Sequence, residues 1–237
     1  MNVALITASG VGSRTHQDIP KQFFHVNDKP IIIYTLEAFQ RHPQIDEICL
    51  VILKGWENIL WAYAKQFNIT KLKYVVEGGA TGQESIYNGV CEIYKHYEGK
   101  DATIIIHDGN RPLVSETIIS DNLAVFAKYG SAVTSIPCVE VAMYSEDKIQ
   151  SDVIVEREYL QRTQTPHSYL LEELYNAHRV AIENHWDNMA AMPVLMQKLG
   201  KKTYFSRGSE KNLKITTIDD LEIFKSLLVA ERAPWLK

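Results

Sequence analysis

The chain has 237 residues, enough to bury one full hydrophobic core as a single domain with at most an appendage. Its formal net charge of −4 and its pI near 6.1 argue against a nucleic-acid-binding surface, although both values are compatible with a local basic pocket. The three cysteines are widely spaced and lack the spacing of metal ligands. No apolar run reaches membrane-spanning length, and no secretory leader pattern opens the chain. We therefore expect a soluble, cytoplasmic protein with neither nucleic-acid nor membrane partners.

An apolar run at residues 3–6 predicts a buried strand, and a loop of small residues follows it directly. This loop contains Gly10 and Gly12 and is followed by two cations, Arg14 and Lys21. Small residues let backbone N–H groups face an anion, and cationic side chains add charge that the backbone dipoles alone cannot supply. We therefore predict a phosphate-binding loop, with a plain strand-to-loop turn carrying two surface cations as the alternative.

The loop differs from the two best-known phosphate-binding motifs. A Walker loop needs Gly-Lys-Ser/Thr at the start of a helix, whereas Ser-Arg follows Gly12. The dinucleotide fingerprint needs a third glycine three residues after the second, where this chain has Thr15. The pattern that remains is Ala-Ser-Gly-x-Gly-x-Arg at residues 8–14, followed by Pro-Lys-Gln at residues 20–22.

The first half of the chain alternates helical and strand patterns. The spacing of apolar residues predicts helices at residues 31–41, 58–67 and 85–97 and strands at residues 48–53, 73–76 and 103–106. Parallel strands need crossover connections, so this alternation predicts an α/β fold with a Rossmann-like, mostly parallel sheet and helices on both faces. Ligands bind beyond the carboxyl ends of the strands in such sheets, where the unusual turns of this chain fall.

The second half is less regular. Its patterns predict strands at residues 131–137 and 203–205 and helices at residues 170–183, 188–199 and 218–230. Residues 139–144 and 149–157 flank a polar turn, which predicts a β-hairpin. Nothing in the pattern places this hairpin in the main sheet. We therefore expect a projecting arm at about residues 139–157 on a single domain that spans residues 1–237.

Asp108 follows the predicted strand at residues 103–106, within the segment His-Asp-Gly-Asn-Arg-Pro. Mg²⁺ prefers one or two carboxylates together with substrate phosphates, and a carboxylate at a strand end near a phosphate loop suits that need. The alternative is a turn-forming Asp before Gly. The residues alone leave both interpretations open.

The glycine-containing loop at residues 8–14, the Pro-Lys-Gln at residues 20–22 and the Asp108 segment follow one another in the order found in the sugar and polyol nucleotidyltransferases, and they resemble the motifs of that family. The Pro-Lys-Gln ending at residues 20–22 is similar to that of the cytidylyltransferases that act on 2-C-methyl-D-erythritol 4-phosphate and on ribitol 5-phosphate. Three segments, at residues 29–32, 55–56 and 212–217, look closer to the ribitol-phosphate enzymes. The resemblance extends from residue 3 to about residue 225 and implies a fold of the nucleotide-diphospho-sugar transferase type.

The resemblance also implies roles for the matching residues. The implied nucleotide-binding residues are Ala8, Ser9, Gly10, Gly12, Gly79, Ala80 and Ser85. The implied catalytic cations are Arg14, Lys21 and Lys214. The implied acceptor-binding residues are Asp108, Arg111, Arg157, Thr165 and Lys214, and Asp108 is also the implied ligand of a Mg²⁺ cofactor.

Several of these positions have a simpler interpretation, and some depart from the family pattern. The simpler interpretation of the Ser85 segment is the start of a helix that Thr81 caps. The simpler interpretation of Arg157 is a solvated charge on the hairpin. His167 replaces the family's Gln and is either an extra polar contact or a surface histidine. The remaining departures from the family pattern are Ser9, Ala80, Gly82, Asn110 and Lys211. Asn110 stands where a small or apolar residue is expected. Lys211 stands where some relatives have a second metal ligand, a role that the neighbouring Glu210 could take instead.

The resemblance implies a Mg²⁺-dependent cytidylyltransferase that converts CTP and a polyol phosphate, with D-ribitol 5-phosphate preferred, to a CDP-alditol and pyrophosphate. The alternatives are 2-C-methyl-D-erythritol 4-phosphate or another alditol phosphate as acceptor and, in a different class, a non-catalytic nucleotide-binding relative. The arm implies a homodimer in which Arg157 completes the site of the neighbouring subunit.

Overall fold

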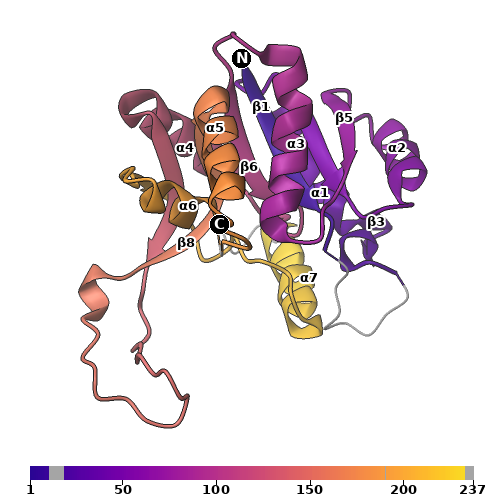
Figure 1. Ribbon diagram of the computed structural model, residues 1–237. Helices are drawn as coiled ribbons and strands as arrows, with labels where there is room; N and C mark the ends of the chain where they lie inside the picture. The colour runs from indigo at the N-terminus through magenta and orange to yellow at the C-terminus, as the bar shows by residue number, and fades with distance from the viewer. Residues whose placement is uncertain (11–18, 190, 233–237) are drawn as a thin grey trace.

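The structure is a computed structural model that describes residues 1–10, 19–189 and 191–232 (Figure 1). Its centre is a seven-stranded sheet in the order β5-β4-β1-β6-β8-β7-β9. These strands are β1 Asn2–Ala8, β4 Glu47–Ile52, β5 Leu72–Glu77, β6 Thr103–Asp108, β7 Ser131–Pro137, β8 Gln161–Leu170 and β9 Phe205–Arg207. A separate two-stranded ribbon pairs β2 His25–Val26 with β3 Lys29–Pro30.

Most neighbouring strands of the main sheet run parallel, which confirms the predicted α/β sheet. β1 pairs in parallel with β4 and β6, β4 with β5, and β7 with β9. The exception is β8, which lies antiparallel between β6 and β7 and was not predicted. This strand matters for the site, because it passes the carboxyl end of β6 in the middle of its length.

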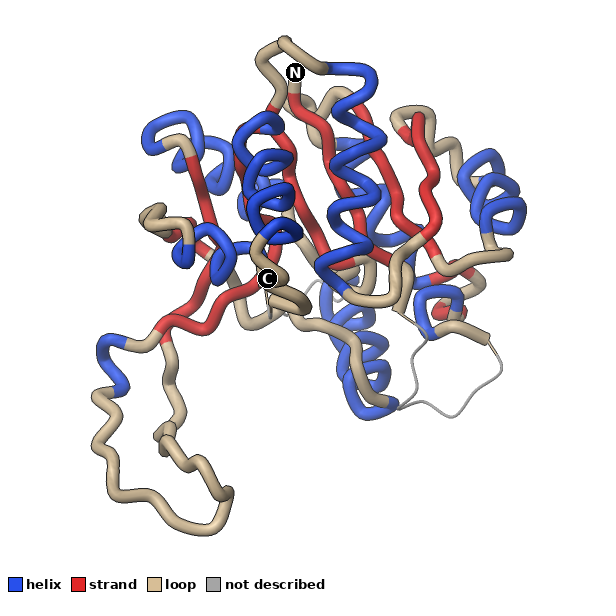
Figure 2. Tube along the Cα trace, in the orientation of Figure 1, coloured by secondary structure: helices blue, strands red, loops and turns tan. Residues whose placement is uncertain are grey.

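Helices cover both faces of the sheet, as Figures 1 and 2 show. On one face lie α1 Ile31–Arg41, α2 Glu57–Gln66 and α4 Glu116–Tyr129, and on the other α3 Gly82–Tyr97, α5 Leu171–Glu183 and α6 Met192–Lys198. Alternation along β1 divides the two cores, since Ala4 and Ile6 pack against the first set of helices and Val3 and Leu5 against the second. No helix in the described residues is both long and apolar enough to cross a bilayer.

The C-terminal helix, α7 Ile218–Arg232, forms a smaller third core near the carboxyl ends of the strands. Phe224 is fully buried and packs in one cluster with Ile31 at the start of α1 and with Ile215. Thr217 caps this helix, because its Oγ1 accepts a hydrogen bond from the N–H of Asp220 at 3.2 Å. This core fixes the segment that precedes α7 beside the turn that follows β6.

Helix α4 is absent from the sequence prediction, although both of its ends carry recognisable signals. The Ser115 side chain accepts a hydrogen bond from the N–H of Ile118 at 3.3 Å, as an N-cap does. At the other end Gly130 adopts a left-handed conformation with φ of 79°, which glycine reaches without the steric cost of a Cβ. The helix packs against β7, β8 and β9 and supports that half of the sheet.

Residues 138–160, which we call the arm, leave the sheet after β7 and return at β8 (Figure 2). The predicted β-hairpin is wrong in detail, since one isolated bridge, Tyr144 with Val153, takes the place of a strand ladder. The polar turn is closed instead by Asp147, whose Oδ1 accepts from the N–H groups of Ile149 and Gln150 at 2.9 and 3.1 Å. A short 3₁₀ turn at Arg157–Tyr159 leads back to the sheet.

Candidate active site

A cavity of about 980 Å³ opens at the carboxyl ends of β1 and β6, where ligands bind in parallel sheets. Its walls come from distant parts of the chain: the end of β1, the turn before α3, the middle of β8 and the segment before α7. The predicted site residues that line it are Ala8, Ser9, Gly10, Lys21, Gly79, Ala80, Ser85, Asp108, Arg111, Thr165 and Lys214. The fold thus brings most of the predicted site together.

The described part of the predicted phosphate loop is held at the end of β1. Gln22 is buried and donates a hydrogen bond from Nε2 to the carbonyl of Ala8 at 2.6 Å. This bond fixes the 3₁₀ turn Lys21–Phe23 against β1 and places Lys21 at the cavity wall. Gly12 and Arg14 lie outside the described residues, so their predicted roles stay predictions.

The turn before α3 contacts the end of β1 through two serines. Ser85 Oγ donates to the carbonyl of Thr81 at 2.8 Å and accepts from the N–H of Gly79 at 3.1 Å and from Ser9 Oγ at 3.0 Å. A Cβ at Gly78 would overlap the side chain of Ser9, so this close approach requires glycine. Thr81 does cap α3, and the same turn also forms a wall of the cavity.

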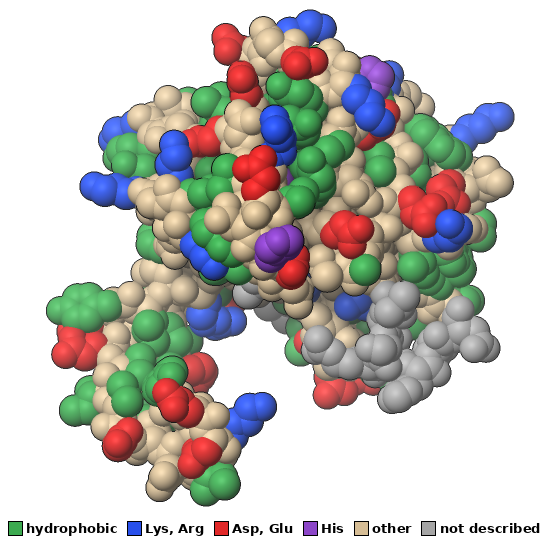
Figure 3. All heavy atoms as spheres, in the orientation of Figure 1, with side chains coloured by type: hydrophobic (Ala, Val, Ile, Leu, Met, Phe, Trp, Pro, Cys, Tyr) green, Lys and Arg blue, Asp and Glu red, His purple; other side chains and the backbone are tan. Residues whose placement is uncertain are grey.

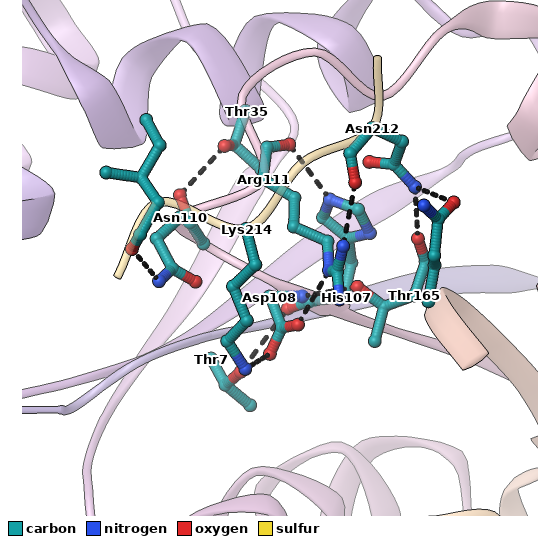
Figure 4. A network of polar contacts seen from close by, with 12 residues as sticks. Thr7, Thr35, His107, Asp108, Asn110, Arg111, Thr165, Asn212 and Lys214 are labelled. Carbon is teal, nitrogen blue, oxygen red and sulfur yellow. Dashed lines mark hydrogen bonds and ion pairs between the residues drawn. The ribbon is translucent and has the colours of Figure 1, made fainter. Parts of the chain in front are cut away.

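Asp108, the last residue of β6, is the centre of the polar network in Figure 4. Its Oδ2 accepts from Nε of Arg111 at 2.9 Å, and its Oδ1 accepts from Nζ of Lys214 at 3.0 Å. Burial by itself would raise the pKa of Asp108, but Lys214 and Arg111 outweigh it and hold that pKa below its usual range. The carboxyl group is therefore ionised, with a cation beside each oxygen.

Hydrogen bonds from Arg111 and Asn110 fix the segment that carries Lys214. Arg111 donates from Nη1 to the carbonyl of Asn212 at 2.7 Å, and Asn110 donates from Nδ2 to the carbonyl of Ile215 at 2.6 Å. The N–H of Ile215 donates back to the carbonyl of Asn110 at 2.9 Å. The segment that carries Lys214 forms no strand, and these bonds hold it beside the turn after β6.

The sequence predicted Thr165 as a site residue but not the strand β8 that carries it or the contacts that this strand makes. Thr165 Oγ1 accepts from the N–H of Asp108 at 3.0 Å, and the carbonyl of Thr165 accepts from Asn212 Nδ2 at 2.9 Å. His167 is 5 % exposed, and burial lowers its pKa to about 4, so its ring is neutral at pH 7. The interpretation of His167 as a surface histidine is therefore wrong.

Among the predicted site residues that the structure describes, Arg157 is the one that the single chain does not bring to the cavity. It lies on the arm, where its Nη1 donates to the carbonyl of Val139 at 2.9 Å. Glu210, the alternative second metal ligand, pairs instead with Arg162 at 3.3 Å. No cluster of three or more His, Cys, Asp or Glu side chains suited to a metal ion occurs in the part of the chain that the structure describes.

Asp108 fits the role of a magnesium ligand in one particular way. Mg²⁺ needs only one or two protein carboxylates when substrate phosphates supply other oxygens, and Asp108 offers one ionised carboxylate at the cavity wall. The Lys214 side chain is 44 % exposed, compared with 12 % for Arg111, so Lys214 is the partner with room to turn towards an anion. The residues present therefore fit a Mg²⁺ ion that is held largely by substrate.

A mostly parallel sheet, a glycine-containing sequence after its first strand and a cation-flanked carboxylate at a neighbouring strand end are the features expected of an α/β nucleotidyltransferase. A family model described as IspD, 2-C-methyl-D-erythritol 4-phosphate cytidylyltransferase, matches residues 2–230. The chain belongs to this family, which confirms the resemblance inferred from its motifs.

Named relatives within this group divide between two acceptors. A ribitol-5-phosphate cytidylyltransferase of Lacticaseibacillus paracasei is 42% identical over 230 residues, with 96% of this chain and 98% of the relative covered. One of Vibrio parahaemolyticus is 38% identical, with 96% of both chains covered. A 2-C-methyl-D-erythritol 4-phosphate cytidylyltransferase of Clostridium novyi is 34% identical, again with 96% of both covered.

Solved structures agree on the fold. The 4-diphosphocytidyl-2C-methyl-D-erythritol synthase of Anaerococcus prevotii superposes with a TM-score of 0.82 at 23% identity, covering 96% of this chain and 95% of that one. The 2-C-methyl-D-erythritol 4-phosphate cytidylyltransferase of Francisella tularensis gives a TM-score of 0.78 at 26% identity, with 94% and 97% covered.

Proposed function

We propose that the protein is a cytidylyltransferase that converts CTP and D-ribitol 5-phosphate to CDP-ribitol and pyrophosphate. The observation that carries the choice of acceptor is the order of the relatives: those named for ribitol 5-phosphate reach 42% and 38% identity, and the one named for 2-C-methyl-D-erythritol 4-phosphate reaches 34%. A cytoplasmic location, expected from the sequence, is part of this proposal.

The reaction is an in-line displacement at phosphorus. An oxygen of the acceptor's phosphate attacks the α-phosphorus of CTP, and the bond from that phosphorus to the bridging oxygen of the β-phosphate breaks. Pyrophosphate leaves on the opposite side and carries away the electron pair of the broken bond. A phosphate dianion is already a competent nucleophile, so the protein has to position the two substrates and neutralise their charge.

The described cations suit this task by their places around the cavity. Lys21, together with Arg14, faces the triphosphate in this proposal, and Arg111 and Lys214 bind the phosphate of the acceptor. To do so, Lys214 exchanges its ion pair with Asp108 for one with substrate, which its exposed position allows. Asp108 would then hold Mg²⁺, and that ion, when bound, adds positive charge beside the phosphate oxygens.

The nucleotide is proposed to lie between the end of β1 and the turn before α3. Ala8, Gly10, Gly79 and Ala80 line this part of the cavity, where the N–H groups of Gly79 and Ala80 donate to Ser85 Oγ at 3.1 Å and to Glu84 Oε2 at 2.7 Å. The Ser85 hydroxyl likewise uses its hydrogen and both lone pairs, with Thr81, Gly79 and Ser9. These bonds hold the turn in one conformation, and a bound base edge would exchange some of them for bonds of its own.

We further propose a homodimer in which the arm of one subunit completes the site of the other. The arm stands clear of the rest of the chain and carries many apolar side chains (Figure 3). Val141, Ile149 and Ile154 are 77 %, 88 % and 90 % exposed, and removing such surfaces from water favours association. Arg157 lies near the C-terminal end of the arm, where the chain returns to the sheet. In this proposal it reaches the acceptor phosphate that is bound to the partner.

Pyrophosphate release from CTP and Mg²⁺ tests the proposed function. The acceptors are D-ribitol 5-phosphate, 2-C-methyl-D-erythritol 4-phosphate, and arabinitol and mannitol phosphates, each at the same concentration. We expect release with D-ribitol 5-phosphate at the highest kcat/KM. Release mainly with 2-C-methyl-D-erythritol 4-phosphate would overturn the acceptor assignment, and CTP binding without release in any mixture would favour a non-catalytic relative.

A further inference from the structure

Asn110 lies in the turn after β6, lines the cavity and is 8 % exposed. Figure 4 shows one end of its amide against a backbone carbonyl, that of Ile215, to which Nδ2 donates at 2.6 Å. A carbonyl can only accept a hydrogen bond, so this contact settles which end of the amide is nitrogen. The orientation of the Asn110 side chain is therefore fixed.

The amide oxygen of Asn110 has a different environment. It accepts no hydrogen bond from any described residue, and it does not belong to the described side-chain atoms that are sealed from solvent without a partner. It is therefore open to the cavity. An amide oxygen has two lone pairs and no hydrogen, so in a hydrogen bond it can only accept, and a substrate group that pairs with it must donate.

The position of this oxygen indicates which ligand donates. Asn110 precedes Arg111, and its partner Ile215 follows Lys214, so the Asn110 side chain lies beside the segments that carry the two cations proposed to bind the acceptor phosphate. The base-binding turn at Gly79 and Ser85 lies on a different wall, at the start of α3. The group next to a phosphate bound by Arg111 and Lys214 is the hydroxylated carbon chain of the acceptor.

We infer that Asn110 is a specificity-determining residue whose Oδ1 accepts a hydrogen bond from one hydroxyl of the acceptor's alditol chain. This inference rests on the proposed function and adds a residue to it. An acceptor with a methyl group or hydrogen at that position leaves the oxygen unpaired in a closed site, which is how a polar group rejects an analogue that lacks its partner.

The test removes the hydroxyl from the acceptor and the amide from the protein, separately and together. The acceptors are D-ribitol 5-phosphate and the pentitol 5-phosphates that lack one hydroxyl each. The proteins are the wild type, Asn110→Ala, Asn110→Val and the matched control Asn184→Ala, which changes an exposed asparagine at the end of α5. The measurements are kcat/KM for each acceptor and KM for CTP.

In the wild type we expect one deoxy acceptor to lose about tenfold in kcat/KM, the usual effect of one net hydrogen bond. Asn110→Ala should lose about the same factor with D-ribitol 5-phosphate and nothing more when that hydroxyl is removed, because the two groups form one contact. KM for CTP should stay unchanged, and Asn184→Ala should match the wild type with every acceptor.

Equal losses by Asn110→Ala with all acceptors would overturn the inference, because the residue would then act only by holding Ile215. A wild type that uses every deoxy acceptor equally well would overturn it without any variant. Asn110→Val keeps more of the side-chain volume and gives the same comparison if the alanine variant does not fold. Absence of pyrophosphate release by the wild type with all acceptors would instead overturn the proposed function, and the inference with it.

Discussion

Nζ of Lys214 lies 3.0 Å from Oδ1 of Asp108, although the two residues are 106 positions apart in the chain. Arg111 occupies the other oxygen of the same carboxylate at 2.9 Å. The more exposed cation of this trio is Lys214, so a phosphate that enters the cavity competes with Asp108 for the ammonium group rather than for the guanidinium. In the proposed function, the ion pair therefore holds Lys214 at the cavity wall until a substrate phosphate takes the place of Asp108.

Replacing Lys214 with alanine should lower kcat/KM for the acceptor by about 30-fold to 1000-fold, equivalent to about 2–4 kcal/mol of lost transition-state stabilisation. Pyrophosphate release measures this loss, and thermal unfolding verifies that the variant is folded. Lys211→Ala removes an exposed lysine from the same segment and should keep normal turnover. Near-normal turnover by Lys214→Ala would contradict the proposed role.

Lys21→Ala should act on the nucleotide side of the reaction. We expect a similar loss of about 2–4 kcal/mol in transition-state stabilisation, because a cation that faces the leaving pyrophosphate is lost. Steady-state pyrophosphate release at saturating acceptor measures kcat and KM for CTP. Lys65→Ala, on α2, is a suitable control because Lys65 does not line the cavity. A folded Lys21→Ala protein with wild-type kcat would show the assignment to be wrong.

Mixing two inactive variants tests whether Arg157 serves the neighbouring site. If it does, Arg157→Ala and Lys214→Ala should each be impaired as pure proteins. After subunit exchange about half of the dimers are mixed, and one of their two sites has both side chains, so activity should return to about a quarter of the wild type. Light scattering verifies the dimer. A mixture that stays as inactive as its components, or a monomer in solution, would argue against the shared site.

Asn122 on α4 should be important for stability although it lies away from the cavity. It is fully buried, its Nδ2 contacts the carbonyl of Pro166 at 3.0 Å and Ser206 Oγ at 2.9 Å, and its Oδ1 accepts from Ser168 Oγ at 2.5 Å. Asn122→Ala leaves several buried groups unpaired and should lower the free energy of unfolding by about 2–4 kcal/mol. Urea denaturation measures it. Ser168→Ala, which removes one of these bonds, should cost less; equal losses would contradict the network.

His178 on α5 predicts a dependence of stability on pH. Burial lowers its pKa from 6.5 to about 4, so the folded state binds fewer protons than the unfolded state between these values. Its contribution to stability is therefore complete above pH 6.5 and is lost as the pH falls towards 4, at about 1.4 kcal/mol per pH unit. Urea denaturation at several pH values should show a shallower slope for His178→Leu. An unchanged slope would mean that this ring is not held neutral.

The sequence predicted those parts of the molecule that depend on local patterns. Helix α1 has the predicted bounds, 31–41, because apolar residues at helical spacing end before Pro43. The parallel half of the sheet followed from strands that alternate with helices. Asp108 was located correctly because a strand end next to a glycine loop is recognisable without any knowledge of its partners.

What the sequence did not predict depends on contacts between distant segments. β8 contains few apolar residues and a proline, and it is a strand because β6 and β7 each offer it an edge. Helix α4 was missed because an asparagine, Asn122, interrupts the apolar pattern of its buried face. The caps at Ser115 and Gly130 were the local signals that could have revealed this helix. The pairing of Asn110 with Ile215 spans 105 residues and leaves no local pattern.

The arm leaves and rejoins the sheet at adjacent positions, since Pro137 at the end of β7 pairs with Gln161 at the start of β8. Residues 138–160 therefore form a loop whose two ends are already held together by the sheet. The entropy of closing such a loop changes by only about 0.6 kcal/mol for each doubling of its length. Insertions and deletions in the arm should therefore cost the fold little, so the arm, and with it the proposed contact between subunits, can change without disturbing the strand that carries Thr165 and His167.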